Sequence, residues 1–137
     1  MTGCFDRKTD ISGFDGVFDC VDNFETRIII SEKGKIARKV LISGGTSATA
    51  GQVIVYDPAD GGPTPAEILG LHEIVDSRKA SHDKRIRTAC RYIPDPSVIM
   101  TNQIIGGLMV DAYRVVLSGT SPANIFYNSE SDEKILT

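Results

Sequence analysis

Histidine, cysteine and aspartate are the residue types in this chain that could carry metal or nucleophilic chemistry. His72 and His82 lie ten residues apart, and Cys90 follows eight residues later. Together these three could supply zinc ligands, but their spacing matches none of the usual zinc patterns. We favour a satisfied His72 and a solvated His82. The sequence therefore predicts no metal site and no cofactor.

The acidic residues near the start of the chain raise a second possibility, a calcium loop. Asp15, Asp19 and Asp22 lie close together in the sequence. Calcium loops of the EF-hand type place their ligands at alternate residues, and this spacing does not match. We therefore reject a calcium site.

The three cysteines, Cys4, Cys20 and Cys90, form no Cys-x-x-Cys pair. An odd number of cysteines argues against a framework of disulfides. The first ten residues also lack the basic and then apolar pattern of a secretory signal. We expect three reduced thiols in a reducing compartment.

Glycine-rich motifs that bind phosphate or hold a nucleophile are missing. Residues 43–51, SGGTSATAG, are rich in glycine but lack the lysine of a P-loop. The chain has no Gly-x-Gly-x-x-Gly and no Gly-x-Ser-x-Gly. The Gly-Ser pair at which some small β barrels cleave themselves is also missing, since the order here is Ser118-Gly119-Thr120. The sequence therefore predicts a protein without catalytic residues, not an enzyme.

Charge is unevenly distributed along the chain. The 137 residues carry a net charge of −3, but six basic residues and one acid lie between Arg78 and Arg91. Alternation over residues 85–93 predicts a strand with Arg85, Arg87 and Arg91 on one face and Tyr92 on the other. Because charge and aromatic stacking lie on opposite faces, we disfavour nucleic-acid binding. A solvated face or a contact to an acidic protein is the preferred interpretation.

Residues 1–25 contain four of the five phenylalanines. Glycines interrupt any regular element here, so we expect an extended arm. Its rings either dock on a partner or fold back on the chain's own core, and both alternatives stay open. The candidate partner-binding residues of the arm are Phe5, Phe14, Phe18 and Phe24.

The remaining elements read as short strands. Residues 26–30 and 36–42 resemble a hairpin, and residues 52–56 and 108–117 are further strands. Residues 64–75 are ambiguous: Thr64, Pro65 and Glu67 are typical of a helix start, but a strand is the rival. The sequence predicts a mostly β domain at 26–127, a small barrel or sandwich of seven or eight strands with at most one or two short helices, and a mobile tail at 128–137.

One known family has a similar order of features. Residues 36–71, from the strand at 36–42 through the small-residue loop, the strand ending in Tyr56-Asp57 and the short apolar segment at 66–69, resemble the capsid decoration proteins of tailed phages, the lambda head-stabilising type. The pattern extends over about residues 25–107. The resemblance implies a catalytically inert homotrimer on a phage capsid.

The resulting functional prediction is a structural virion protein that stabilises a phage head. Its expected partners are the major capsid protein or other virion subunits, and its expected location is the capsid surface after synthesis in the host cytoplasm. No membrane contact is predicted, and nucleic acid is disfavoured. The alternatives are a head-tail joining or tail-tube component, a small nucleic-acid-binding barrel and, with least support, an enzyme that uses His72 or Cys90.

Overall fold

A computed structural model of the chain describes residues 4–85 and 99–137, and the side chains of residues 4–80 and 99–137. The described helices are α1 (Phe24–Ala37), α2 (Pro65–Ile68), α3 (Leu71–Arg85) and α4 (Ile99–Leu117). The described strands are β1 (Gly16–Asp19), β2 (Val40–Thr46), β3 (Ala50–Tyr56), β4 (Ile125–Asn128) and β5 (Ile135–Leu136).

The strands form one sheet in the order β1-β2-β3-β4-β5. β1 pairs with β2 in parallel, and the other neighbours pair antiparallel. The parallel pair is joined by α1, as a parallel connection needs a crossover. Within the described backbone, β1 forms one edge of the sheet, and its outer side has no strand partner.

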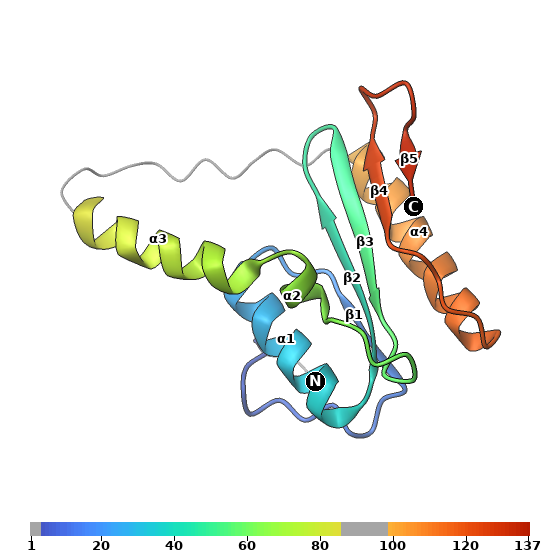
Figure 1. The fold of residues 1–137 in the computed structure, drawn as a ribbon, viewed down its shortest axis with the longest axis horizontal. Helices are drawn as coiled ribbons and strands as arrows, with labels where there is room; N and C mark the ends of the chain where they lie inside the picture. The colour runs from blue at the N-terminus through green and yellow to red at the C-terminus, as the bar shows by residue number, and fades with distance from the viewer. Residues whose placement is uncertain (1–3, 86–98) are drawn as a thin grey trace.

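Helices cover both faces of this sheet (Figure 1). α4 lies on one face, where Ile105, Met109 and Ala112 pack against Ile42 and Val53. α1 lies on the other face, where Ile30 packs against residues of β2 and β3. Alternate residues of β2 therefore enter two separate cores, as the period of two in a strand requires.

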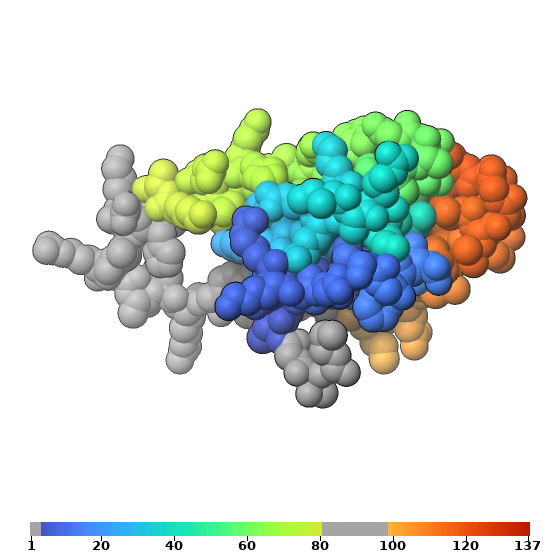
Figure 2. Space-filling view, turned by 90° about the horizontal axis from the view of Figure 1, so that it is seen from below, coloured from blue at the N-terminus to red at the C-terminus, as the bar shows by residue number. Residues whose placement is uncertain are grey.

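The N-terminal segment lies against the α1 side of the molecule, as Figure 2 shows in blue against cyan. Phe5 packs against the cluster of Ile30, Leu41 and Tyr56, and so do two residues of the β1 region. The far end of α3 extends away from the sheet in Figure 1. Among the described residues, no helix combines the length and apolar character that a membrane crossing needs.

Local signals explain the ends of α1 and α2. The Asn23 side chain caps α1 by accepting a hydrogen bond of 2.8 Å from the Thr26 N–H. Thr64 and Glu67 form a reciprocal capping box at the start of α2, with Pro65 at the first helical position. The helix alternative for the start of residues 64–75 is therefore confirmed, and α3 continues it after Gly70, whose φ of 61° favours glycine.

The prediction of a mostly β barrel or sandwich is wrong, because the chain forms an open mixed sheet covered by helices. The strand predicted at 26–30 lies within α1, and the first residues of the one at 36–42 complete that helix. The strand predicted at 108–117 is the second half of α4. The strand at 52–56 is confirmed as part of β3.

Two further predictions fall partly or wholly outside the description. The basic strand at 85–93 lies outside the described residues, except that Arg85 ends α3. The division into an arm at 1–25, a domain at 26–127 and a tail at 128–137 stays a prediction. Within it, β1 belongs to the predicted arm and β5 to the predicted tail.

Candidate functional site

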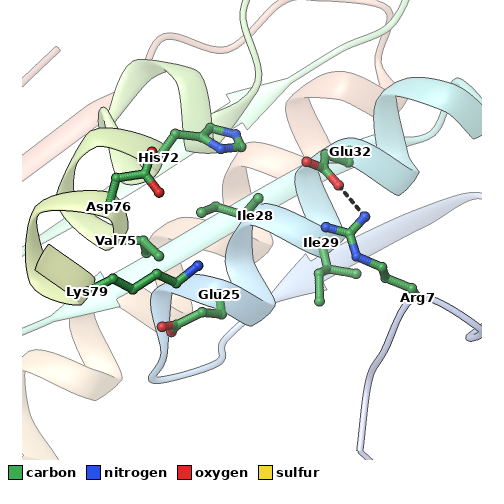
Figure 3. Close-up of a pocket in the computed structure, with 9 residues that line it drawn as sticks. All are labelled: Arg7, Glu25, Ile28, Ile29, Glu32, His72, Val75, Asp76 and Lys79. Atoms are coloured by element: carbon green, nitrogen blue, oxygen red, sulfur yellow. Dashed lines mark hydrogen bonds and ion pairs between the residues drawn. The ribbon is translucent and has the colours of Figure 1, made fainter. Parts of the chain in front are cut away.

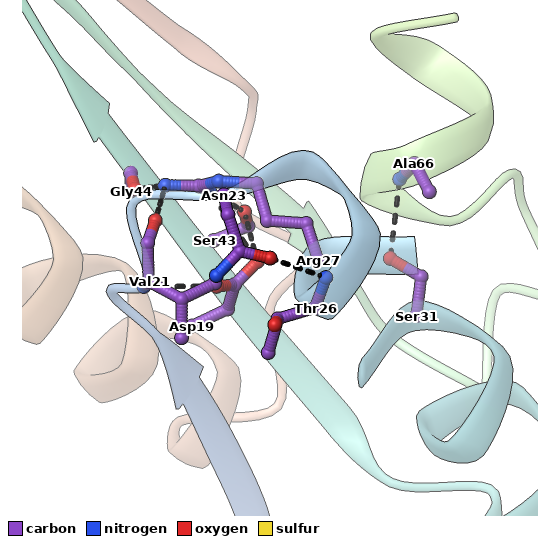
Figure 4. Close-up of polar contacts among 9 residues, drawn as sticks. All are labelled: Asp19, Val21, Asn23, Thr26, Arg27, Ser31, Ser43, Gly44 and Ala66. Carbon is purple, nitrogen blue, oxygen red and sulfur yellow. Dashed lines mark hydrogen bonds and ion pairs between the residues drawn. The ribbon is translucent and has the colours of Figure 1, made fainter. Parts of the chain in front are cut away.

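The carboxyl end of β1 is fixed by a buried polar network around Arg27 (Figure 4). The Arg27 guanidinium donates to the Asp19 carboxylate at 3.3 Å and to the Ser43 hydroxyl at 2.7 Å. The Ser43 hydroxyl in turn donates to the same carboxylate at 2.8 Å. Arg27 also donates to the carbonyl oxygens of Val21 at 2.7 Å and Gly44 at 2.5 Å.

This network joins three elements at one point. Asp19 ends β1, Arg27 lies in the first turns of α1, and Ser43 lies in the middle of β2. Only 1% of Asp19 and 8% of Arg27 is exposed, so the pair is shielded from water. Among the described buried side chains, every polar atom has a hydrogen-bond partner. The network therefore holds the loop after β1 in one position.

The loop that follows, residues 20–23, lines an open pocket of about 410 Å³. Its polar residues are Asp22, Asn23 and Thr26, and its apolar residues are Phe5 and Val21. Two thiols complete the lining, those of Cys4 and Cys20. The carboxyl ends of parallel strands are the usual ligand-binding edge of open α/β sheets. The pocket is therefore our candidate functional site.

The electrostatics of this pocket differ from those of the network beneath it. Asp22 is exposed, whereas Asp19 is paired with Arg27. The positive end of the α1 dipole lies at the same loop and favours anions. Cys20 is exposed overall, but partial burial of its thiol raises the pKa of that thiol, and the nearby Asp19 carboxylate raises it further against a smaller opposing effect of Arg27. Cys20 is therefore mainly a neutral thiol near pH 7.

A second hollow, of about 180 Å³, lies between α1 and α3 (Figure 3). Ile28, Ile29 and Val75 supply its apolar lining. Its rim carries charges of both signs, and Arg7 pairs there with Glu32 at 3.0 Å. The polar rim consists of Arg7, Glu25, Glu32, His72, Asp76 and Lys79. Mixed charge on a small surface hollow offers less for catalysis than the pocket at β1.

The predicted partner-binding phenylalanines separate into two groups. Phe5 packs beside β1 against the cluster of Ile30, and Phe24 packs against the α1–α3 core, with the Arg78 guanidinium 4.5 Å from its ring centroid. Phe14 and Phe18 are 58% and 43% exposed. Phe18 also makes an edge-to-face contact with Tyr113 of α4, with ring centroids 5.3 Å apart.

The other candidate residues are not brought together by the described structure. His72 is exposed on α3. The side chains of His82 and Arg85 lie outside the description, as do Arg87, Cys90 and Arg91. Among the described residues, no group of three or more histidine, cysteine or acidic side chains could hold a metal ion.

Sequence reasoning missed the functional potential of Cys20, Asp22 and Asn23. The spacing of Asp22 raises only the possibility of a calcium ligand, and the number of cysteines predicts only a reduced thiol at Cys20. The signal that could have found them is the order of β1, a short polar loop and the Asn23 cap of α1. A strand followed by a capped helix places the intervening polar residues at the carboxyl end of the strand.

Comparison with solved structures supports the fold assignment. The crystal structure of selenomethionine-labelled PaaA superposes with a TM-score of 0.54 at 14% sequence identity. The match covers 82% of this chain and 38% of that chain. At this identity the likeness concerns the fold alone, and that fold is α/β.

Two curated relatives match a shorter stretch of sequence. The adenylyltransferase and sulfurtransferase MOCS3 of Drosophila yakuba is 41% identical over 51 residues, and that of Drosophila sechellia is 39% identical over 51 residues. Each match covers 37% of this chain and 11% of the relative. This chain therefore corresponds to a small part of the length of these relatives.

The comparisons also overturn the predicted function. The resemblance to capsid decoration proteins is wrong, and so are the predictions drawn from it: a non-catalytic role, a capsid-bound trimer, virion partners and a virion location. The curated relatives are enzymes, and the family model that matches has no connection with capsids. That model describes the ThiF family and matches residues 6–133, which is most of the sequence. The chain belongs to the ThiF family.

Proposed function

We propose that this chain takes part in adenylyl transfer, and that the pocket at the carboxyl end of β1 is its place of action. Adenylyl transfer moves the nucleoside monophosphate of ATP to an acceptor and releases pyrophosphate. The observation that carries the proposal is the exposed Asp22 carboxylate in this pocket. Family membership and the name of the curated relatives support it.

The residues of the pocket fit one part of such a reaction. Mg²⁺ in nucleotide sites is commonly held by one or two carboxylates together with the phosphates of the substrate. Asp22 supplies one such carboxylate, and the nearby N-terminus of α1 favours a phosphate group. When bound, Mg²⁺ would neutralise charge on the triphosphate, and Asp22 would hold it beside the helix N-terminus.

The same pocket fits the triphosphate less completely. No lysine or arginine is among the residues that line it, and the sequence contains neither a P-loop nor a Gly-x-Gly-x-x-Gly. We therefore assign to this chain one wall of the site, the one that contains Asp22, Cys4 and Cys20. The buried Asp19–Arg27 pair keeps this wall rigid.

Binding of MgATP to the chain tests the proposal directly. A ligand at ten times its dissociation constant stabilises the folded state by about 1.4 kcal/mol, which raises Tm by about 5 °C for a chain of this size. We expect millimolar MgATP to raise Tm, and Asp22→Asn to remove most of this increase. ATP with EDTA should give a smaller shift than MgATP.

A matched control separates Asp22 from general charge effects. Asp15 is also exposed and lies outside the pocket, so Asp15→Asn makes the same change in net charge. It should keep the full MgATP shift. An unchanged Tm in MgATP, or an equal loss in both variants, would contradict the proposed site.

The exposed Phe14 and Phe18 favour a second proposed role, contact with a protein partner. Both lie at or near β1, the edge strand whose outer side has no strand partner in the described backbone. Phe18→Ser should weaken such a contact without changing the MgATP shift. The predicted partner-binding roles of Phe5, Phe24 and the arginines at 85, 87 and 91 stay predictions.

A further inference from the structure

Two of the three cysteines line one pocket, although 16 positions separate them in sequence. Cys4 enters it from the N-terminal segment, and Cys20 enters it from the loop after β1. Both side chains are exposed and neither is in a disulfide. The odd number of cysteines argues against a disulfide framework and does not indicate that two of them line the same pocket.

The fold brings the two thiols together through different anchors. Cys20 directly follows Asp19, whose carboxylate is held by Arg27 and Ser43. Cys4 directly precedes Phe5, which packs into the same cluster as Val21. One thiol therefore lies on a fixed loop, while the other lies on a segment that packs on the same apolar cluster as that loop.

We propose that Cys4 and Cys20 form a dithiol that closes to an intrachain disulfide and thereby acts as a redox-controlled clasp across the pocket. The disulfide would join the N-terminal segment to the loop that carries Asp22. It would also remove both thiols from the pocket lining. Closure itself does not depend on the proposed function, but any effect on adenylyl transfer rests on it.

The oxidant is a small disulfide, such as oxidised glutathione. One protein thiolate attacks a sulfur of this disulfide, forms a mixed disulfide and releases one glutathione thiol. The second protein thiolate then attacks the protein sulfur of the mixed disulfide and releases the second glutathione thiol. The two protein thiols lose two protons and two electrons in total, and the small disulfide gains them as two thiols.

Geometry sets the condition for closure. The Cα atoms of a disulfide lie within about 7 Å of one another, so the N-terminal segment must be able to bring Cys4 that close to Cys20. The raised pKa of Cys20 keeps its thiol mainly protonated near pH 7. Because the thiolate is the reacting form, closure should become faster as the pH rises.

Mass spectrometry of the full chain after treatment with oxidised glutathione tests the clasp. We expect the intact mass of Cys90→Ser protein to fall by two hydrogen atoms. A non-reduced digest of both this variant and the wild-type protein should contain a linked Cys4–Cys20 peptide. Cys4→Ser and Cys20→Ser should each stop at a glutathione adduct, and both should fold because the two side chains are exposed.

Three results would overturn the inference: a link that involves Cys90, a link between two chains, or a Cys90→Ser chain that stops at glutathione adducts. The MgATP shift is then measured on reduced and closed Cys90→Ser protein, with a several-fold weaker apparent affinity expected for the closed form. Equal affinities would refute control of the pocket. A missing MgATP shift in the reduced protein counts against the proposed function alone, whereas a missing link counts against the clasp alone.

Discussion

Replacing Arg27 by methionine should destabilise the chain far more than replacing any exposed arginine. Arg27 satisfies the Asp19 carboxylate and two carbonyl oxygens in a region that water does not reach. Arg27→Met keeps much of the side-chain volume but leaves a buried carboxylate without its cation. Removing one partner of a buried ion pair typically costs about 3–5 kcal/mol.

The size of this loss can be converted into a melting temperature. An unfolding entropy of about 2.1 cal/mol/K per residue implies that each kcal/mol lowers the Tm of a 137-residue chain by about 3.5 °C. Arg27→Met should therefore lower Tm by about 10–17 °C. Calorimetry gives Tm, and urea unfolding followed by circular dichroism gives the free energy of unfolding independently.

The chain contains a matched control for this substitution. Arg7 pairs with Glu32 at the surface, where 72% of the Arg7 side chain is exposed. Arg7→Met removes the same functional group and should cost less than about 1 kcal/mol. A double variant with Arg27→Met and Asp19→Asn should cost less than the two single losses together, because it leaves no unpaired buried charge. Equal losses for the two methionine variants, or full additivity in the double variant, would refute the reasoning.

Three further perturbations test other parts of the structure. Contact with the Lys35 ammonium, together with the capping box, lowers the pKa of Glu67 from 4.5 to about 2. The contribution of the ionised Glu67 to stability is therefore complete above pH 4.5 and is lost as the pH falls toward 2. Glu67→Gln should cost about 1 kcal/mol at pH 7 and almost nothing at pH 2, which thermal melts at the two pH values measure. Because the pKa of Cys20 is raised above 9.0, the rate of its alkylation by iodoacetamide should reach half its maximum above pH 9. Mass spectrometry follows this rate, and a midpoint below pH 9 would show that burial does not raise the pKa of this thiol. A Cβ on Gly51 would lie 2.6 Å from Ile105 and 2.7 Å from the Gly45 carbonyl oxygen, so Gly51→Ala should cost about 1–3 kcal/mol. Gly62→Ala, in open space, should not. Equal urea midpoints for the two variants would show that both neighbours of Gly51 can move away.

Local chemistry in the sequence was a good guide where a few neighbouring residues decide the structure. The Thr64, Pro65 and Glu67 pattern needs only its own side chains to start a helix, and the helix forms. The strand at 52–56 also formed, because its β-branched residues match the buried centre of a sheet.

Local chemistry misled where helices are rich in β-branched residues. Residues 26–30 have high strand propensity, but Arg27, Ser31 and Gly34 are buried at helical spacing, and tertiary contacts override the propensity. The predicted strand at 108–117 is likewise part of a helix, α4, although Gly106 and Gly107 lie in the middle of that helix. The spacing of Thr101, Ile105, Met109 and Ala112 is helical, and these side chains bury one face against the sheet.

The candidate site shows what sequence alone cannot predict, because two aspartates three positions apart have different roles. Asp19 lies on the α1 side of the sheet, where its carboxylate accepts hydrogen bonds from Arg27 and Ser43. Ser43 is 24 residues away in sequence. Asp22 lies beyond the strand and keeps its carboxylate exposed in the pocket. Sequence spacing cannot assign these roles, since they depend on where β1 stops and which strand lies beside it.

The same contrast provides a test of how the site is built. If the network only stabilises the fold, Asp19→Asn should lower Tm strongly and weaken MgATP binding only in proportion to the unfolded fraction. Asp22→Asn should leave Tm unchanged without ligand and abolish most of the MgATP shift. Binding below the melting range, measured by calorimetric titration, distinguishes the two effects. A direct loss of affinity in folded Asp19→Asn would mean that the buried carboxylate orients the pocket residues as well as holding the fold.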